Sequence, residues 1–499
     1  MKGWRRKVGG DGRRKRAGFV LDIIFENGVV EMAEEIELEL SPMYEGERIR
    51  KEEIWVEMGG PKADGFELCI SAPMDEVEDG KVTIKGPDIN EIEEGKTIPF
   101  GMIFKVAGEL IETDLESIIE RRNHALLSYV HGLMHLNQRD AIWMRAGLDL
   151  KKAGVTSFEQ IFKNVMKLYL AELPFIEKIE AVILTSPEEV AKGLEEAHAK
   201  YSARDARAKG LHDEEVDVFY GCTLCQSFAP TSACCVTPDR PSLCGAISWF
   251  DGRAAAKVDP EGPQFQIPKE GLIDDIAGEY ESVNEMAASR SGGEYSRMAL
   301  YTFFDAPHTS CGCFETIGFY MPEVDGIGIV DRDFRNPTPN GLPFSTMAGQ
   351  AGGGKQVVGF LGMGILYYFS PKFLQADGGW RRIVWMPKEL KEKVKEGIDA
   401  DMFDKIATEE DAPDLESLKK FLLKADHPVV DGVERKVDSK KISEGWKIED
   451  PSEFEDAVIA FIEESGGDID VDAIKEKLNM SEGQFMQVIE YLQDEGILE

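Results

Sequence analysis

The spacing of apolar residues predicts a chain that changes from strands to helices and then to a less regular segment. From about residue 19 to 110, short apolar or alternating runs are separated by glycine, proline and acidic turns, a pattern typical of β-strands. These runs read GFVLDIIF, EIELEL, IWVEMG and FELCISA. From about 112 to 208, apolar residues recur every three or four positions, which predicts helices. Asp114 is placed to cap the first helix, and Pro187 takes the first position of another.

The second half of the chain has a different pattern. Residues from about 215 to 400 are rich in glycine, proline and aromatic side chains, and the strands expected there are short. From 400 onward the chain is acidic and helical, with amphipathic segments PDLESLKKFLLKA and EFEDAVIAFIEES. We therefore expect a multidomain α+β protein. Its expected units are a disordered basic tail at 1–18, an α+β domain at 19–208, a metal-cluster α+β domain at 209–400 and a small acidic helical extension at 401–499.

Charge and hydropathy exclude two classes of partner. The formal charge is −36, from 93 acidic and 57 basic residues. Phosphate contacts require a positive face, so we expect no nucleic-acid partner. No apolar run reaches the roughly 18 residues of a membrane span, so we expect no membrane association. The basic start of the chain is not followed by an apolar segment, which predicts a cytoplasmic protein. Clustered cysteines in that compartment bind metal more often than they form disulfides.

The first cysteine group comprises four residues on one segment. Two, eight and nine residues separate consecutive members of the set Cys222, Cys225, Cys234 and Cys244. Four thiolates suit either a tetrahedral zinc ion or a [4Fe–4S] cluster. A zinc ribbon usually has two pairs of cysteines separated by two residues, whereas nine residues separate Cys234 from Cys244. This spacing and the apolar surroundings favour the iron–sulfur cluster over zinc. Cys235, adjacent to Cys234, is either the true ligand of the pair or a small buried hydrophobic residue.

The second group is the Cys311–Gly312–Cys313 tripeptide. Its two sulfurs and the amide nitrogens of Gly312 and Cys313 can all reach one metal ion through unstrained rings of five and six atoms. The result is a planar set of two nitrogens and two sulfurs, which favours Ni(II) over copper in a reducing cytosol. The alternative is a pair of buried structural cysteines. Because both thiolates retain lone pairs, they can also bridge to a second metal.

These motifs resemble the acetyl-CoA synthase family, in particular the beta subunits of the archaeal acetyl-CoA decarbonylase/synthase complex. The resemblance covers about residues 20–400. It is carried by the segments SPMYEGERIRKEE, RRNHALLSYVHGLMHLNQRDAIWMR, GCTLCQSFAP, CVTPDRPSLCGAISW, FETIGFYMPEVDGIGIVDRDF and AGQAGGGKQVVGFLGMGILY, together with the two cysteine groups.

The resemblance implies a compound nickel–iron–sulfur centre, the A-cluster. A [4Fe–4S] cluster would be held by the four-cysteine set, and two nickel ions would complete the centre. Cys225 would bridge the cluster to a proximal nickel, and Cys311 and Cys313 would bridge that nickel to a distal one, which also binds the backbone nitrogens of Gly312 and Cys313. Phe228 matches a phenylalanine that shapes ligand access to the proximal nickel.

The resemblance also implies an activity and partners. The reaction would assemble or cleave acetyl-CoA from CO, a corrinoid-bound methyl group and coenzyme A. The implied partners are a corrinoid iron–sulfur protein as methyl donor and CO dehydrogenase subunits. The alternative function, from another class, is an electron-transfer or structural protein with an ordinary [4Fe–4S] or zinc site.

Several other features have weaker functional interpretations. The GQAGGGKQ segment departs from a nucleotide-binding loop at Gln356, so we expect a glycine-rich turn near the metal site or near coenzyme A. His124, His131 and His135 fit one helical pattern. The spacing of His131 and His135 can bind zinc, but no glutamate follows the first histidine as in a zinc motif, so the histidines are interpreted as satisfied or interface residues. The four arginines Arg121, Arg122, Arg139 and Arg145 contact either coenzyme A phosphates or ordinary ion-pair partners. Residues 471–499 resemble a helix-turn-helix fragment, interpreted as an assembly module because the segment is acidic.

Overall fold

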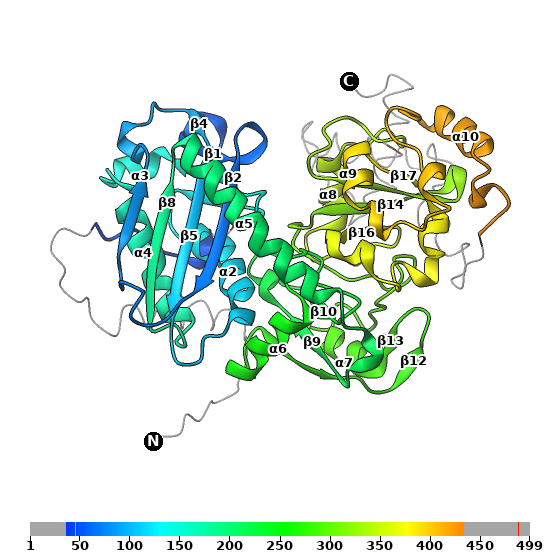
Figure 1. Ribbon diagram of the computed structural model, residues 1–499, viewed down its shortest axis with the longest axis horizontal. Coiled ribbons are helices and arrows are strands. Elements are labelled where there is room, and N and C mark those ends of the chain that lie inside the picture. Colours follow the sequence, from blue (N-terminus) through cyan, green and yellow to red (C-terminus); the bar gives the residue numbers. More distant parts are fainter. Residues whose placement is uncertain (1–35, 45, 434–487, 489–499) are drawn as a thin grey trace, which may run out of the picture.

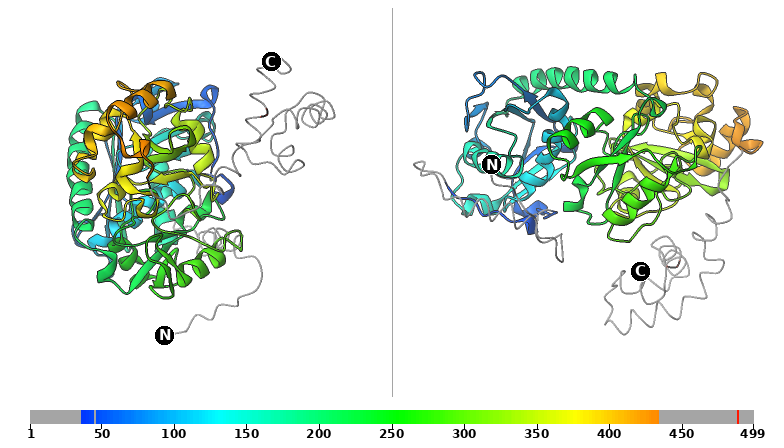
Figure 2. Two further views of the ribbon diagram at one scale, coloured as in Figure 1. Left: turned by 90° about the vertical axis from the view of Figure 1, so that its right-hand side faces the viewer. Right: turned by 90° about the horizontal axis from the view of Figure 1, so that it is seen from below.

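The computed structural model describes residues 36–44, 46–433 and 488. Figure 1 shows two bodies side by side, a blue-to-cyan one built from the first half of the chain and a green-to-orange one built from the second. The long helix α5 (Pro187–Ala208) runs from the first body to the second, and the view from below in Figure 2 shows the same crossing. The described part combines helices with several sheets, which confirms the predicted multidomain α+β class.

The first body contains two four-stranded sheets. One has the order β4 (Lys96–Ile98), β1 (Ile54–Gly59), β7 (Trp143–Gly147) and β6 (Leu133–Leu136). The other has the order β2 (Gly65–Ser71), β5 (Phe100–Ala107), β8 (Lys178–Leu184) and β3 (Val82–Lys85). The helices of this body, besides α5, are α2 (Glu116–Ser128), α3 (Leu148–Lys152) and α4 (Phe158–Glu172).

The predicted helical region at 112–208 is partly wrong. Helix α2 ends at Ser128, and the chain turns through Gly132, whose φ of 83° suits glycine, into strand β6. His131 and His135 therefore do not share a helical face. Strand β8 likewise replaces a predicted helical stretch: the strand pairs with β5 and β3, and its alternate apolar residues Ile179, Ala181 and Ile183 are buried. Ser186 and Pro187 begin α5 as expected.

The second body also contains two main sheets. The first has the order β10 (Cys234–Val236), β9 (Val218–Cys222) and β11 (Gln264–Pro268). The second has the order β16 (Phe360–Met363), β14 (Thr316–Met321), β15 (Gly326–Asp331) and β17 (Ile383–Trp385). A two-stranded sheet joins β12 (Leu272–Asp274) to β13 (Glu279–Tyr280), and the helices are α6 (Trp249–Val258), α7 (Glu281–Arg290), α8 (Phe344–Ala351), α9 (Lys388–Lys393) and α10 (Leu415–Lys424).

Helix α2 occupies the boundary between the two bodies. It packs on β2 and β6 of the first body and also contacts α6 of the second. All thirteen of its residues are buried, although the helix carries charged and polar side chains. A polar helix without an exposed face needs a partner for each polar group, because burying an unpaired charge is costly. Asp114 does not cap this helix as predicted; it pairs with Arg207 and Arg253 instead.

The hydrophobic core is continuous across the boundary. One buried cluster includes Phe104 of β5 and Ile327 of β15, and Cys222, Cys234 and Cys244 belong to the same cluster. The four-cysteine segment therefore lies in the interior that joins the two bodies. Helix α10 matches the predicted amphipathic segment and packs through Leu418 and Leu422. The predicted helix EFEDAVIAFIEES, the basic tail and most of residues 471–499 lie outside the described residues.

Candidate metal centre

Three short elements position the four-cysteine set. Cys222 is the last residue of β9, and Cys225 lies in the 3₁₀ turn Leu224–Ser227 that follows. Cys234 begins β10, and Cys244 lies in a turn that continues through Gly245, whose φ of 77° suits glycine. Cys222, Cys234 and Cys244 are buried, and Cys225 is partly exposed. The sequence pattern predicted short strands and turns in this region, and such elements hold the four cysteines in place.

The pairing of β9 and β10 separates Cys234 from Cys235. Cys234 lies directly opposite Cys222 in the antiparallel ladder, whereas Cys235 lies opposite Gly221. Side chains of successive strand residues point to opposite faces. Accordingly, Cys234 packs in the cluster that contains Cys222, and Cys235 packs with Phe219 and other residues of a separate hydrophobic cluster. The geometry groups Cys234, and not Cys235, with the other cysteines of the set.

The Cys311–Gly312–Cys313 tripeptide forms a turn just before β14. Gly312 has a φ of 122°, a conformation that residues with a side chain rarely adopt, and no atom lies close to where its Cβ would be. The glycine-rich turn supports this conformation from behind. The amides of Gly353 and Gly354 donate hydrogen bonds to the carbonyls of Cys311 and Ser310, at 3.2 and 2.8 Å. This confirms the predicted packing role of the GQAGGGKQ segment, which forms the end of α8 and the following turn.

The two cysteine groups meet at one point. Cys311 lies close enough to Cys225 and to Cys313 for these thiols to shift one another's pKa, so the turn before β14 lies against the four-cysteine segment. Both neighbours hold the pKa of Cys311 well above the usual thiol value. The Cys311 thiol, aided by the Arg121 charge, lowers the pKa of Cys225 to about 7. The same thiol holds the pKa of Cys313 well below its usual range.

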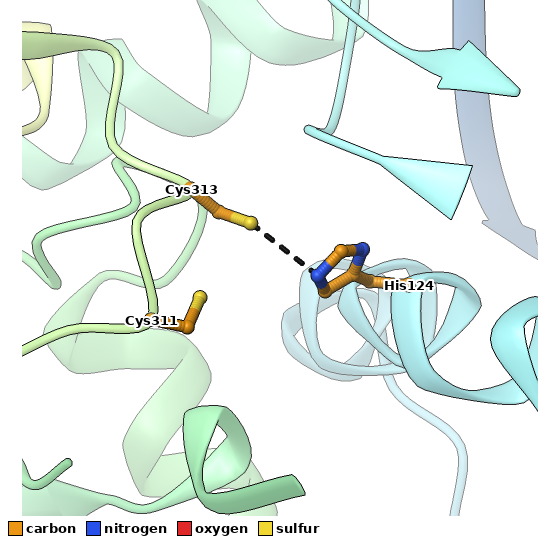
Figure 3. Close-up of side chains that lie close together, drawn as sticks. All are labelled: His124, Cys311 and Cys313. Atoms are coloured by element: carbon orange, nitrogen blue, oxygen red, sulfur yellow. Dashed lines mark hydrogen bonds between the residues drawn. The ribbon is translucent and has the colours of Figure 1, made fainter. Parts of the chain in front are cut away.

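Helix α2 contributes two side chains to this meeting point. The Arg121 guanidinium lies 3.9 Å from Cys311 Sγ, and His124 Nε2 lies 3.4 Å from Cys313 Sγ (Figure 3). The His124 ring also stacks on Phe228, with 4.1 Å between the ring centroids. Burial lowers the pKa of His124, which favours its neutral ring. Phe228, the predicted access residue, therefore lies beside the cysteines but is covered by a ring from the first body.

The surroundings of the sulfurs fit a thiolate-bound metal centre. Burial raises the pKa of Cys222 to about 12 and raises that of Cys234 as well, so without a metal these thiols stay protonated in an apolar interior. Polar groups nevertheless point at sulfur: Gln264 Nε2 lies 3.5 Å from Cys222, and Ser242 Oγ lies 3.1 Å from Cys244. Hydrogen bonds of this kind stabilise cysteinate ligands and tune a cluster.

Sequence reasoning missed the roles of Arg121 and His124. Their spacing of three residues on a helix was the available signal, since it places both on one face. Of the four arginines considered, three form ordinary ion pairs, namely Arg122 with Glu172, Arg139 with Asp205, and Arg145 with Glu57. Arg121 differs: no carboxylate within the described ranges pairs with it, and the nearby cysteines raise its pKa above an already high value despite burial.

Comparison with known proteins agrees with this geometry. A family model described as CO dehydrogenase/acetyl-CoA synthase complex beta subunit matches residues 36–190, and a second, described as the C-terminal part of the ACS/CODH beta subunit, matches residues 201–433. These two models assign the described chain, apart from a short stretch within α5, to one class of multidomain protein.

Curated relatives agree over most of the chain. The acetyl-CoA decarbonylase/synthase complex subunit beta of Archaeoglobus fulgidus is 62% identical over 434 residues, which are 87% of this chain and 83% of that protein. Subunit beta 2 of Methanosarcina thermophila is 63% identical over 79% of this chain and 84% of its own length. The chain belongs to the family of acetyl-CoA decarbonylase/synthase complex beta subunits, which confirms the resemblance found in the sequence. None of the described helices has the length and apolar character to span a membrane.

Proposed function

We propose that this chain is the catalytic subunit that assembles or cleaves acetyl-CoA from CO, a corrinoid-bound methyl group and coenzyme A. Family membership supports the proposal, because the curated relatives are named as beta subunits of the acetyl-CoA decarbonylase/synthase complex. The observation that carries it is the close approach of Cys311 to Cys225, two cysteines that lie 86 residues apart in the sequence and each shift the other's pKa. In this role the chain is a cytoplasmic CO-methylating acyltransferase.

The residues that would hold the A-cluster follow from the sequence spacing and the geometry. Cys222, Cys225, Cys234 and Cys244 would bind a [4Fe–4S] cluster; Cys311, Gly312 and Cys313 would bind nickel. Cys225, Cys311 and Cys313 would also hold the second nickel ion. Such a centre, when bound, supplies the low-coordinate metal that joins a methyl group to CO and releases the acetyl group to a thiol.

The chain's own residues prepare this site in three ways. The Arg121 guanidinium offsets the negative charge of buried thiolates, which favours their deprotonated, metal-binding form. Gly312 gives the turn a backbone conformation, with a φ of 122°, that residues with a side chain rarely adopt. Phe228 and His124 place stacked rings beside the sulfurs and shield them in part from water.

Metal analysis of anaerobically purified protein, combined with an activity assay, tests the proposal. We expect about four iron and two nickel ions per chain, and CO-dependent acetyl-CoA synthesis with a methylcobamide donor. Cys311→Ala should abolish synthesis while it leaves the iron–sulfur absorbance largely unchanged. Cys69→Ala, at a buried cysteine of β2 outside the centre, is the control and should retain nickel. Zinc alone, or iron without nickel, would instead support an electron-transfer or structural metal protein.

The family name also implies partner subunits in a complex. We propose that CO dehydrogenase subunits supply CO and that a corrinoid iron–sulfur protein supplies the methyl group. Size-exclusion chromatography of mixtures of the purified components, followed by the synthesis assay with and without each component, tests each partner separately.

A further inference from the structure

His124 lies where a metal ligand would lie. Its Nε2 atom and the sulfurs of Cys311 and Cys313 all lie within 4.8 Å of one another. A zinc-like ion with sulfur at about 2.3 Å and imidazole nitrogen at about 2.0–2.1 Å would place those two atoms about 3.6 Å apart in a tetrahedral site. The observed distance from His124 Nε2 to Cys313 Sγ is 3.4 Å. Figure 3 shows the ring edge directed at the cysteine turn.

The partners of His124 leave Nε2 free to bind a metal. His124 Nδ1 lies 3.3 Å from His135 Nδ1, and His135 Nε2 lies 3.0 Å from Glu67 Oε2. Glu67 Oε2 already accepts a hydrogen bond from Asn123, so it faces His135 as an acceptor. Donation from His124 Nδ1 to His135 Nδ1 leaves the lone pair of His124 Nε2 directed at the cysteine turn.

That arrangement matches the usual environment of a metal-binding histidine. Such a residue donates its second ring nitrogen to a fixed acceptor, and a carboxylate further out sets the tautomer. His124, His135 and Glu67 are all buried, with at most 3% of each residue exposed. The stacking of His124 on Phe228 alone would not require a second buried histidine with a glutamate beside it.

We propose that His124 is a protein ligand of the metal held by Cys311 and Cys313, with Cys225 as the third sulfur, and that His135 and Glu67 position its ring. The proposal deepens the proposed function, on which its catalytic meaning rests. A four-coordinate site of three sulfurs and one nitrogen has no vacant position. Since His124 belongs to the first body and the cysteines to the second, the described arrangement is a closed form, in which substrates can reach the metal only after His124 leaves it.

Cobalt titration tests this ligand set without relying on catalysis. Protein is purified anaerobically from cells grown without added nickel and titrated with Co²⁺ alone. We expect the strong visible absorption of tetrahedral Co²⁺ bound to thiolates, and X-ray absorption at the cobalt edge should show the outer-shell scattering of one imidazole. His124→Ala should remove the imidazole scattering and weaken Co²⁺ binding. His135→Gln should weaken binding about 10–100-fold, as expected for a residue that orients a ligand.

The matched control is His198→Ala, because His198 is half-exposed on α5 and pairs with Asp140 at 2.8 Å. This variant should bind Co²⁺ as the unmodified protein does. Unmodified protein that binds Co²⁺ without imidazole scattering would overturn the proposal whether or not any variant folds, and so would protein that binds no Co²⁺. If only the proposed function is wrong, the result differs. The protein then binds Co²⁺ with imidazole scattering but acquires no nickel or iron during anaerobic reconstitution.

Discussion

Cys234 lies directly opposite Cys222 in the ladder between β9 and β10, and its neighbour Cys235 faces the other side of the strand. Directly opposed residues of an antiparallel pair have Cβ atoms about 4.5–5.5 Å apart, a separation that one iron–sulfur cluster can span. The sequence alone does not decide whether Cys234 or Cys235 is the cluster ligand. In the structure the two side chains lie on opposite faces of the sheet, and only Cys234 shares a face with Cys222.

Substitution of the two adjacent cysteines tests this difference. Cys234→Ser should remove most of the bound iron and the iron–sulfur absorbance, because a cluster ligand is lost. Cys235→Ser should retain iron and lose about 1–3 kcal/mol of stability, because it places a hydroxyl in an apolar cluster. Iron content and visible absorbance of the anaerobically purified variants measure the first effect, and urea unfolding measures the second. Equal iron loss in both variants would contradict the assignment of Cys234.

Arg121 is expected to control thiol ionisation at the meeting point. In metal-free protein, Arg121→Met should raise the pKa of Cys225 from about 7 toward the ordinary thiol value, because a nearby positive charge is removed. The pH dependence of Cys225 alkylation, followed by peptide mass spectrometry, measures this pKa. Arg122→Met is the control: Arg122 lies on the same helix as Arg121 but pairs with Glu172 of α4, so its loss should leave the Cys225 profile unchanged. Identical profiles for all three proteins would show that Arg121 has no such effect.

The sequence was sufficient for the α+β class and for the two cysteine groups, because local signals determine both. Ser186 and Pro187 define a helix start by their chemistry, and the spacing of Cys222, Cys225, Cys234 and Cys244 predicts a ligand set without reference to the rest of the fold. The same holds for Cys311–Gly312–Cys313, whose φ requirement at Gly312 is visible from the residue type alone.

The sequence was insufficient where tertiary contacts decide the outcome. The segment after Ser128 has an apolar spacing that also fits a helix, but pairing with β7 makes residues 133–136 a strand. Arg121 and His124 lie about 190 residues from the turn they contact, and the spacing that places them on one helical face does not say what that face contacts. Their role becomes visible only when α2 is seen to be buried between two bodies.

Gly312 is expected to be required for its backbone conformation. Gly312→Ala should destabilise metal-free protein by about 1–3 kcal/mol, because a side chain strains a φ of 122° even though the space around it is open. Nickel binding should fall as the turn distorts. Gly349→Ala is the control: Gly349 lies within α8 with open space around it, and alanine there should stabilise by about 0.5–1 kcal/mol. Urea unfolding and nickel content measure both variants, and equal stability changes would contradict the argument from φ.

His427 is expected to make the second body sensitive to acid. Its ring is buried, with Nε2 donating to the Ile383 carbonyl at 2.9 Å, and burial lowers its pKa to about 4. The unfolded chain binds the proton near pH 6.5, so the stability that this residue contributes is complete above pH 6.5 and is lost as the pH falls toward 4. Between pH 7 and 5 the loss should be about 2 kcal/mol, because each pKa unit corresponds to about 1.4 kcal/mol. Urea unfolding of metal-free protein should therefore show that the difference in unfolding free energy between the unmodified protein and His427→Gln shrinks by about 2 kcal/mol from pH 7 to pH 5. Above pH 7 this difference should stay constant. Parallel curves for the two proteins would show that His427 does not control the acid response.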